Sequence, residues 1–342
     1  MAEIIPIHQH KINFNEAVKN LSILCKEDLL SINTLILEKL DSSVPLIQEI
    51  GKYLILSGGK RLRPLLTTSC FHILNNKSTN KINHVGLAAA VEFIHAATLL
   101  HDDVVDLSKD RRGKPTANEI WNNKTSVLVG DFLFSRSFQL MTKYGNLETL
   151  KILSDTSVII SEGEVLEISN DKNLEMNEDT YFKIINGKTA SLFSAACQVG
   201  GISAQTQKNE LEALKSFGLN FGMCFQLIDD TLDYASDSKA MGKNIGDDFK
   251  EGKITLPVIL AYGRSNEKEK KFWEKTIFEL KQNPNDFAEA IRIINKYNCA
   301  KDTIIRAKHF ADVAIDSLNI FKNNLYKESL IKLIKFSINR LG

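Results

Sequence analysis

The sequence contains two short acidic motifs whose residue types and spacing could bind metal ions. The first is LLHDDVVD at residues 99–106, and the second is FQLIDDTLDY at residues 225–234. Both follow apolar segments of helical periodicity, where an unpaired buried carboxylate is costly, so something must neutralise these charges. One such motif alone could be the solvated acidic end of a helix. A second copy makes that interpretation hard to keep.

The spacing within each motif predicts carboxylate pairs. Residues four apart lie one turn apart on the same face of a helix, which pairs Asp102 with Asp106 and Asp229 with Asp233. Mg²⁺ suits such pairs because it takes a few carboxylate oxygens and completes its shell with water and substrate phosphates. If the two helices face each other, six carboxylates line one cavity that must recruit several divalent cations and a highly anionic ligand. They are Asp102, Asp103, Asp106, Asp229, Asp230 and Asp233.

An anionic ligand held through metal ions also needs direct cations, and the sequence has basic residues near glycines and predicted helix ends. Arginine binds phosphate through two parallel hydrogen bonds, whereas lysine acts as a point charge. The glycines of SGGKRLRP let the backbone approach a ligand closely. Any one of these residues could be an ordinary solvated cation. The candidates are Lys60, Arg61, Arg63, Arg111, Arg112, Lys188, Lys243 and Lys253, with Thr189 beside Lys188.

Helix-length segments with apolar residues three and four apart must position these groups. Only six prolines in 342 residues favour an all-α fold, and polar loops rich in Asn, Lys and Ser separate the segments. Nothing marks a boundary, so we expect one large helical domain over residues 1–342. The predicted helices cover 15–56 (a pair interrupted near DSSVP), 84–107, 124–145, 148–169, 178–200 and 207–235, with lysine-rich amphipathic helices from 250 onward.

Composition excludes several other classes of protein. The net charge of +1 gives no electrostatic reason to expect nucleic acid as a partner. Neither a Walker A motif nor a GxGxxG turn is present, which disfavours a nucleotide site. The five cysteines are odd in number and never spaced as CxxC, which argues against a disulfide framework or a structural zinc site and favours a reducing compartment. No signal peptide or membrane span is evident, so we expect a cytoplasmic location.

Six motifs together resemble those of the trans-polyprenyl diphosphate synthases. In chain order they are GGKRLRP, LLHDDVVD, DRRGKPTAN, GKTA, FQLIDDTLDY and EGKITLP. The resemblance covers about residues 45–262, and the chain looks most like bacterial long-chain enzymes of the octaprenyl and decaprenyl type, which supply quinone side chains. It implies the isoprenoid synthase fold, in which helices surround a deep central cavity, usually in a homodimer.

The resemblance also implies roles for individual residues. The residues expected to hold the diphosphate of isopentenyl diphosphate are Lys60, Arg63, His95 and Arg112. The residues expected to bind three Mg²⁺ ions bridging to the allylic diphosphate are Asp102, Asp106, Asp229 and Asp233. The residues expected to contact the allylic group are Arg111, Lys188, Thr189, Gln226 and Lys243. The residues expected to take part in the chemistry are Asp102, Asp103, Asp106, Lys188, Asp229 and Asp230.

One of these expectations has a competing interpretation, and one motif departs from the family's pattern. His95 lies on an apolar helix, where a histidine is more often an ordinary core residue; its place one and two turns before the aspartates and the resemblance favour a ligand role. The linker LSKDRRG departs from the common long-chain pattern at Lys109 and Asp110, while both arginines are intact.

The expected reaction is the expulsion of diphosphate from the allylic substrate, followed by attack of isopentenyl diphosphate on the resulting cation. Magnesium ions and basic side chains stabilise the charge on the leaving group, and an apolar cavity protects the cation. The released diphosphate can take the final proton, so no dedicated protein base is expected. Small residues at Ala97 and Thr98, one turn before the first aspartates, should let a long product pass. Met141 and Leu153 are candidates for the floor of the tunnel, although both could be plain core.

Three alternatives are weighed against a long-chain synthase. A terpene cyclase shares one DDxxD motif, but it binds no second diphosphate and so does not need the second motif or GGKRLRP. An inactive regulatory subunit should have lost aspartates or arginines that this chain retains. A short-chain farnesyl or geranylgeranyl diphosphate synthase is disfavoured by Ala97 and Thr98. The lysine-rich C-terminal helices would allow transient association with a membrane during product release.

Overall fold

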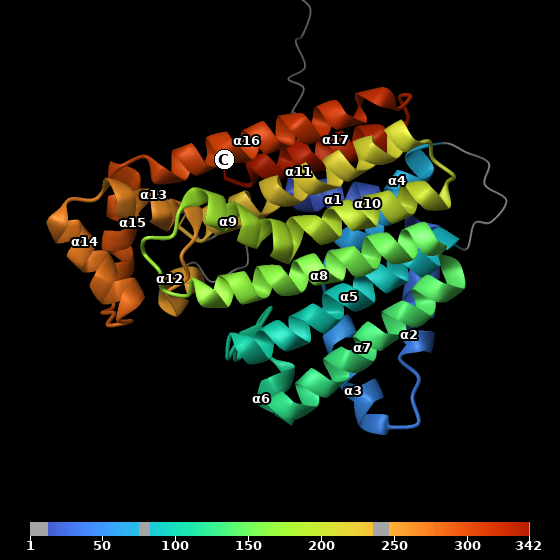
Figure 1. Cartoon of the computed structure of the whole chain (residues 1–342), viewed down its shortest axis with the longest axis horizontal. Coiled ribbons are helices and arrows are strands. Elements are labelled where there is room, and N and C mark those ends of the chain that lie inside the picture. The colour runs from blue at the N-terminus through green and yellow to red at the C-terminus, as the bar shows by residue number, and fades with distance from the viewer. Residues whose placement is uncertain (1–12, 75–82, 235–245, 342) are drawn as a thin grey trace, which may run out of the picture.

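The computed structural model describes residues 13–74, 83–234 and 246–341 and is helical almost throughout (Figure 1). The α-helices are α1 (Phe14–Leu24), α2 (Lys26–Lys39), α3 (Pro45–Leu56), α4 (Leu62–Ile73), α5 (Asn83–Val105), α6 (Ala117–Trp121), α7 (Asn123–Tyr144), α8 (Leu147–Ser169), α9 (Glu178–Ile185), α10 (Ser191–Ser203), α11 (Lys208–Leu232), α12 (Asp247–Glu251), α13 (Leu256–Arg264), α14 (Glu267–Trp273), α15 (Asp286–Lys296), α16 (Cys299–Ser317) and α17 (Leu325–Ile338).

Short irregular elements interrupt this pattern. Two π-helical segments, η1 (Asn186–Ala190) and η3 (Glu274–Phe278), and two 3₁₀ segments, η4 (Leu318–Ile320) and η5 (Asn339–Leu341), join the longer helices. The strands β1 (Asp110–Arg111) and β2 (Lys114–Pro115) form an antiparallel hairpin directly after α5. The all-α fold class is confirmed, and the single domain expected over residues 1–342 stays a prediction.

The helices expected at 84–107, 124–145, 148–169 and 207–235 are confirmed by α5, α7, α8 and α11, with ends shifted by a few residues. Capping residues explain some of the helix boundaries. Asn146 caps the start of α8 and forms a capping box with Thr149.

Two expectations about helices were wrong. Residues 15–56 form three helices because α1 ends at Cys25, whose backbone (φ −98°, ψ 17°) leaves the helical region before α2 begins at Lys26. Residues 178–200 are not one regular helix, since η1 separates α9 from α10. Hydrophobic periodicity detects the apolar face of such a stretch but not a local change in the hydrogen-bond pattern.

Helix α5 runs through the middle of the helical array and packs against α7, α4, α2 and α10 (Figure 1). Side chains on all of its faces are buried, from His84 and Val85 near its start to Leu100 and Asp103 near its end. Among the described helices it is the one whose length and hydropathy would suffice to cross a membrane, yet 78% of that window is buried within the protein. This burial is typical of a core helix, and it attaches the first acidic motif to the hydrophobic core.

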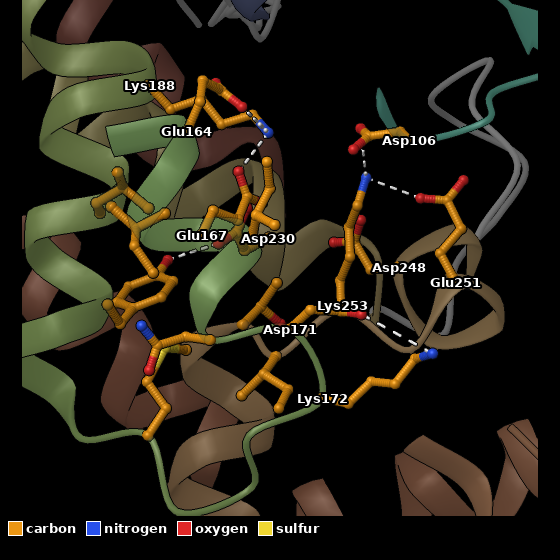
Figure 2. A pocket seen from close by; sticks show the side chains of 18 of the residues that line it. Asp106, Glu164, Glu167, Asp171, Lys172, Lys188, Asp230, Asp248, Glu251 and Lys253 are labelled. Carbon is orange, nitrogen blue, oxygen red and sulfur yellow. Dashed lines mark hydrogen bonds and ion pairs between the residues drawn. The ribbon is translucent and has the colours of Figure 1, made fainter. Parts of the chain in front are cut away.

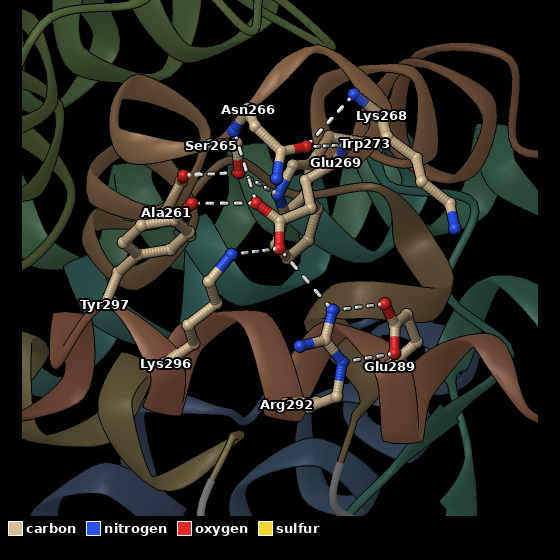
Figure 3. Close-up of polar contacts among 10 residues, drawn as sticks. All are labelled: Ala261, Ser265, Asn266, Lys268, Glu269, Trp273, Glu289, Arg292, Lys296 and Tyr297. Carbon is tan, nitrogen blue, oxygen red and sulfur yellow. Dashed lines mark hydrogen bonds and ion pairs between the residues drawn. The ribbon is translucent and has the colours of Figure 1, made fainter.

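A second, smaller hydrophobic core forms around α13–α15, at the end of the molecule away from α7 (Figure 1). Next to its fully buried Trp273, Glu269 accepts hydrogen bonds from the Lys296 ammonium at 2.8 Å and the Tyr297 hydroxyl at 2.8 Å (Figure 3). The Arg292 guanidinium lies 3.5 Å from the same carboxylate. We call Glu269, Arg292, Lys296 and Tyr297 the Glu269 cluster.

Candidate active site

A pocket of about 500 Å³ lies where α5, α8, η1, α11 and α12 meet, and acidic side chains outnumber lysines in its wall (Figure 2). We call it the acidic pocket. Its charged lining residues are Asp106, Glu164, Glu167, Asp171, Lys172, Lys188, Asp230, Asp248, Glu251 and Lys253. Asp106 comes from the first acidic motif and Asp230 from the second. The two motifs therefore meet at one cavity through Asp106 and Asp230, whereas the other four aspartates expected to line it are not among its lining residues.

Lys188 enters this pocket because two helix backbones touch. A Cβ atom at Gly163 of α8 would lie 2.8 Å from the Cα of Gly187 in η1, so only glycine permits this approach. The contact brings the Lys188 ammonium to 2.6 Å from Glu167 and 3.7 Å from Glu164. Burial alone would lower the pKa of Lys188, but these two carboxylates outweigh it and raise that pKa. Lys188 is therefore a fixed positive charge.

Lys253 provides a second fixed charge on the opposite wall. Its ammonium lies 2.7 Å from Glu251 and 3.5 Å from Asp106 of the first motif (Figure 2). The preceding Gly252 ends α12 in the left-handed region at φ 74°, which turns the chain toward the pocket. Burial lowers the pKa of Lys253, and the carboxylates, Asp106 first, raise it by more.

The carboxylates of α5 have different surroundings. Burial, together with repulsion from Asp106 and Glu167, raises the pKa of Asp102 to about 6, although Lys188 and Arg111 act against the shift. Asp103 is fully buried and accepts from Arg111 at 2.8 and 2.6 Å. Asp103 and Arg111, which we expected at the reacting groups, thus neutralise each other beside the pocket and fix the hairpin that follows α5.

The second motif places one carboxylate in a chain of hydrogen bonds. Asp230 is buried and accepts from the Tyr181 hydroxyl at 2.5 Å and from the Gln226 amide at 2.7 Å. Thr189 in turn donates to Gln226 at 2.8 Å. Burial raises the pKa of Asp230 to about 7 despite these donors, and the neighbouring Asp229 and Glu167 add to the shift. Three predicted residues, Thr189, Gln226 and Asp230, are thus brought together.

The other two aspartates of this motif lie against later parts of the chain. Asp229 is 3.3 Å from the guanidinium of Arg340 in η5. Asp233 accepts backbone N–H groups from Gly246, Asp247 and Asp248 at 3.1–3.3 Å, so it anchors the start of α12. This anchoring brings Asp248 into the wall of the acidic pocket.

A separate set of basic residues surrounds His95, about two turns before Asp102 on α5. We call Arg61, Arg63, His95 and Arg112 the basic cluster. Burial and then the charges of Arg63, Arg112, Arg111 and Arg61 lower the pKa of His95 well below its usual value. Burial also lowers the pKa of Arg63 to about 10, and its Nε atom has no hydrogen-bond partner among the described residues. Three of the residues predicted to bind isopentenyl diphosphate therefore converge.

Left-handed backbone conformations present two of these arginines. Arg61 has φ 47° at the start of α4, and Arg112 has φ 56° in the β1–β2 turn, where Gly113 also has positive φ. Two consecutive residues with positive φ form the turn type that matches the twist of a two-residue hairpin. The Arg112 guanidinium donates to the Gly58 carbonyl, and Arg61 pairs with Glu92. Such outliers often mark functional positions.

The remaining predicted residues occupy varied places. The Lys60 ammonium lies 4.8 Å from the centroid of the Phe14 ring. Ala97, Met141 and Leu153 are fully buried in the main core, and the half-buried Thr98 donates to the His95 carbonyl at 2.9 Å. These four chain-length candidates are not part of the acidic pocket. Lys243 lies outside the described residues.

Sequence reasoning missed several residues of the site: Glu164, Glu167, Tyr181, Asp248 and Arg340. A signal was available for two of them. Glu164 and Glu167 lie three residues apart in an α8 segment with apolar neighbours, the pattern that singled out the aspartates. Asp248 and Arg340 carry no comparable local signal, because only the folded chain brings them to the second motif.

The donor set of the acidic pocket suits Mg²⁺. Its carboxylates supply only hard oxygen ligands, which Mg²⁺ prefers. Burial raises the pKa of Glu164 to about 7, and nearby Asp102 and Glu167 reinforce the shift against the opposing charge of Lys188. Asp102, Glu164 and Asp230 therefore share an excess of negative charge that a divalent cation would relieve.

Comparisons with known proteins agree with this geometry. The polyprenyl synthetase family profile matches residues 44–294. Octaprenyl diphosphate synthase of Escherichia coli K12 is 39% identical over 323 residues, covering 94% of this chain and 99% of that protein. A decaprenyl diphosphate synthase structure from Rhodobacter capsulatus superposes with a TM-score of 0.90 at 43% identity, covering 95% of this chain and 99% of that one.

A third relative was solved with ligands. The polyprenyl synthase of Caulobacter crescentus CB15, in complex with calcium and isoprenyl diphosphate, gives a TM-score of 0.89 at 43% identity and covers 95% of this chain and 98% of its own. Family profile, sequence identity over nearly the whole chain and shared architecture agree. The chain belongs to the polyprenyl synthetase family and is a trans-prenyltransferase with the isoprenoid synthase fold.

Proposed function

We propose that the protein is a Mg²⁺-dependent synthase that condenses isopentenyl diphosphate repeatedly with an allylic diphosphate, farnesyl diphosphate being the expected primer. The product is a long all-trans polyprenyl diphosphate of the octaprenyl or decaprenyl class, destined for quinone side chains. One observation carries the proposal: aspartates of both motifs line one pocket with Lys188 and Lys253, beside a separate basic cluster. Two distinct anion sites are what a reaction between two diphosphates requires.

The acidic pocket would hold the allylic diphosphate. Asp102, Asp106 and Asp229, with Asp233 nearby, would be the ligands of three Mg²⁺ ions. When bound, these ions supply Lewis-acid stabilisation of the charge that develops on the departing diphosphate. Lys188 and Lys253 are held protonated by their carboxylate neighbours, so they offer permanent charges to the same leaving group. The Thr189–Gln226–Asp230 hydrogen bonds keep this wall of the pocket in one arrangement.

The basic cluster would hold the diphosphate of isopentenyl diphosphate. Arg63 and Arg112 supply charge and paired donors, and His95 is neutral among these arginines, so it contributes a hydrogen bond rather than a charge. Among the described residues of this cluster, Arg61 pairs with Glu92 and the arginines outnumber the carboxylates, which suits a second anionic substrate. The proton lost after bond formation can pass to the released diphosphate, and no side chain is assigned as base.

The expected product length rests on Ala97 and Thr98. Both are small and lie on α5 within one or two turns of Asp102, where bulkier side chains would obstruct a growing tail. The long-chain relatives named above support the same assignment. Met141 and Leu153 remain our candidates for the floor of the tunnel.

We further propose that the enzyme is a cytoplasmic homodimer that associates with a membrane only transiently to release its product. Large apolar side chains are exposed along α7 and α8, among them Leu128, Val158 and Val165. Such a face on neighbouring helices suits a second copy of the chain.

Product sizing tests the proposed activity. The chain is incubated with farnesyl diphosphate, labelled isopentenyl diphosphate and Mg²⁺, and the products are separated by length. Octaprenyl or decaprenyl diphosphate is the expected product. Accumulation of farnesyl or geranylgeranyl diphosphate alone would identify a short-chain synthase, and failure to incorporate label would leave the regulatory-subunit alternative.

A further inference from the structure

Three helices bring one carboxylate and two imidazoles together, away from the acidic pocket. Asp28 lies in the first turn of α2, His72 in the last turn of α4, and His84 in the first turn of α5. The Nε2 atom of His72 is 2.7 Å from one Asp28 oxygen, and the Nε2 atom of His84 is 3.0 Å from the other. We call these three residues the His–Asp cluster.

The three potential ligand atoms are close enough to share one metal ion, since all lie within 4.8 Å of one another. Zinc binds imidazole nitrogen and carboxylate oxygen at about 2.0–2.2 Å, so neighbouring ligands of a tetrahedral ion are separated by about 3.3 Å. The two nitrogen–oxygen distances, 2.7 and 3.0 Å, go to different oxygens of Asp28 and would need to widen by about 0.6 and about 0.3 Å. Metal would then replace the protons that the imidazoles now share with Asp28.

Aromatic neighbours hold both imidazoles in place. Phe71 stacks on His84 with ring centroids 3.9 Å apart, and Tyr326 of α17 stacks on His72 at 4.7 Å. The Nδ1 atom of His84 has no hydrogen-bond partner among the described residues. The polar contact of this ring is therefore the one between its Nε2 atom and Asp28. Rings fixed in this way are preorganised as ligands.

The cluster is also accessible from solvent on one side. The His84 side chain is 1% exposed, whereas Asp28 is 21% and His72 30% exposed. An ion can therefore arrive past His72, and water can occupy a fourth position. Cysteine spacing argued against a structural zinc site, but this ligand set contains no cysteine and its members are far apart in the sequence.

We propose that Asp28, His72 and His84 form a zinc site with three protein ligands and one solvent ligand, separate from the Mg²⁺ site. His84 and Asp102 are 18 residues apart on α5, which is about 27 Å along a helix. The two sites thus occupy opposite ends of the same core helix. A bound ion would cross-link α2, α4 and α5 through side chains.

Metal titration under saturating Mg²⁺ tests this proposal, because Mg²⁺ occupies the carboxylates of the acidic pocket. The full chain is stripped with a chelator, then titrated with Zn²⁺ by calorimetry and with Co²⁺ by visible absorption. We expect one ion per chain, X-ray absorption at the zinc edge with two imidazole ligands, and a melting temperature that rises with Zn²⁺. Absence of binding, or an all-oxygen ligand set, would overturn the proposal.

Matched variants locate the ion. His72→Gln should weaken Zn²⁺ binding at least tenfold and abolish the rise in melting temperature, whereas His309→Gln, at an exposed position on α16, should change neither. Asp28→Asn repeats the test with a near-isosteric change, and circular dichroism verifies that both variants fold. Equal Zn²⁺ affinity in the wild type and a folded His72→Gln or Asp28→Asn protein would mean that these residues form only a hydrogen-bonded cluster.

Discussion

The Glu269 cluster and the acidic pocket both hold shielded carboxylates, but the chain treats them in opposite ways. In the Glu269 cluster, Lys296 and Tyr297 each donate to one carboxylate, and Arg292 lies close by (Figure 3). The hydrogen bond from Lys296 is the main reason that the pKa of Glu269 falls to about 2. This carboxylate is satisfied by the protein itself.

The acidic pocket has the opposite balance. Burial raises the pKa values of Glu164 and Asp230 in the pocket to about 7 each and that of Asp102, beside the pocket, to about 6, and the neighbouring acids reinforce these shifts. Lys188 and Lys253 are present, but each is already shared between two carboxylates. A surplus of acid in a pocket indicates a site that functions with an external cation, whereas a matched set indicates a structural role.

The largest expected effect comes from removing one of the aspartates proposed to bind Mg²⁺. Asp102→Ala or Asp229→Ala should lower turnover by at least about 10²-fold, because a group that stabilises the leaving diphosphate is lost. The fold should persist, since Asp102 is held in an unfavourable ionised state. Label incorporation and thermal melting check both statements.

Asp155→Ala provides the matched control, because this exposed acid on α8 pairs with Lys151 at the surface. It should leave turnover unchanged. Near-normal activity in Asp102→Ala and Asp229→Ala would remove the metal-binding assignment.

Removing divalent metal should distinguish the acidic pocket from the Glu269 cluster without any mutation. Excess chelator should abolish product formation, while circular dichroism should still report a helical protein, because the Glu269 cluster and the hydrophobic cores need no ion. Restoring Mg²⁺ should restore activity. Turnover that persists in excess chelator would contradict the role proposed for the acidic pocket.

The sequence predicted part of the acidic pocket and made no prediction about the Glu269 cluster. The two DDxxD motifs predicted a shared cavity, and one aspartate of each, Asp106 and Asp230, lines the acidic pocket. Local spacing cannot report contacts between distant segments. It therefore missed Asp248, which depends on the capping of α12 by Asp233, and Arg340, which approaches Asp229 from the C-terminal end.

The inability of local spacing to report distant contacts also explains the errors in the predicted fold. Long apolar segments such as α5 and α11 were predicted well, because burial of a whole helix leaves a strong periodic signal. The π-helical η1 was missed, although it carries Lys188 and Thr189, since its hydrogen-bond pattern depends on the contact between Gly163 and Gly187. The β1–β2 hairpin was missed for a similar reason: its strands are two residues long, too short for any alternation to be visible.

A substitution in the proposed product channel should have a smaller effect on total turnover. Thr98→Phe adds a ring one turn before Asp102, so elongation should stop at a shorter chain while label incorporation continues. Thr98→Ser is the control, because it keeps the hydroxyl that donates to the His95 carbonyl. An unchanged product length in Thr98→Phe would argue against a path along this face of α5.

The smallest effect is expected in the Glu269 cluster, and it should appear in stability alone. Glu269→Gln removes the charge that Lys296 and Arg292 pair with, so the melting temperature should fall by a few degrees at neutral pH while turnover is unchanged. The fall is modest because those two cations are 40% and 53% exposed and solvent screens them.

The pH dependence tests the cause. Folding lowers the pKa of Glu269 from 4.5 to about 2, so its contribution to stability is complete above pH 4.5 and is lost as pH falls through about 2. The difference in melting temperature between the wild type and Glu269→Gln should therefore shrink steadily between these two values. A difference that is independent of pH would show that Glu269 acts through its shape and its capping hydrogen bonds, not through its charge. The contrast between a matched and a surplus set of acids would then lose its electrostatic basis.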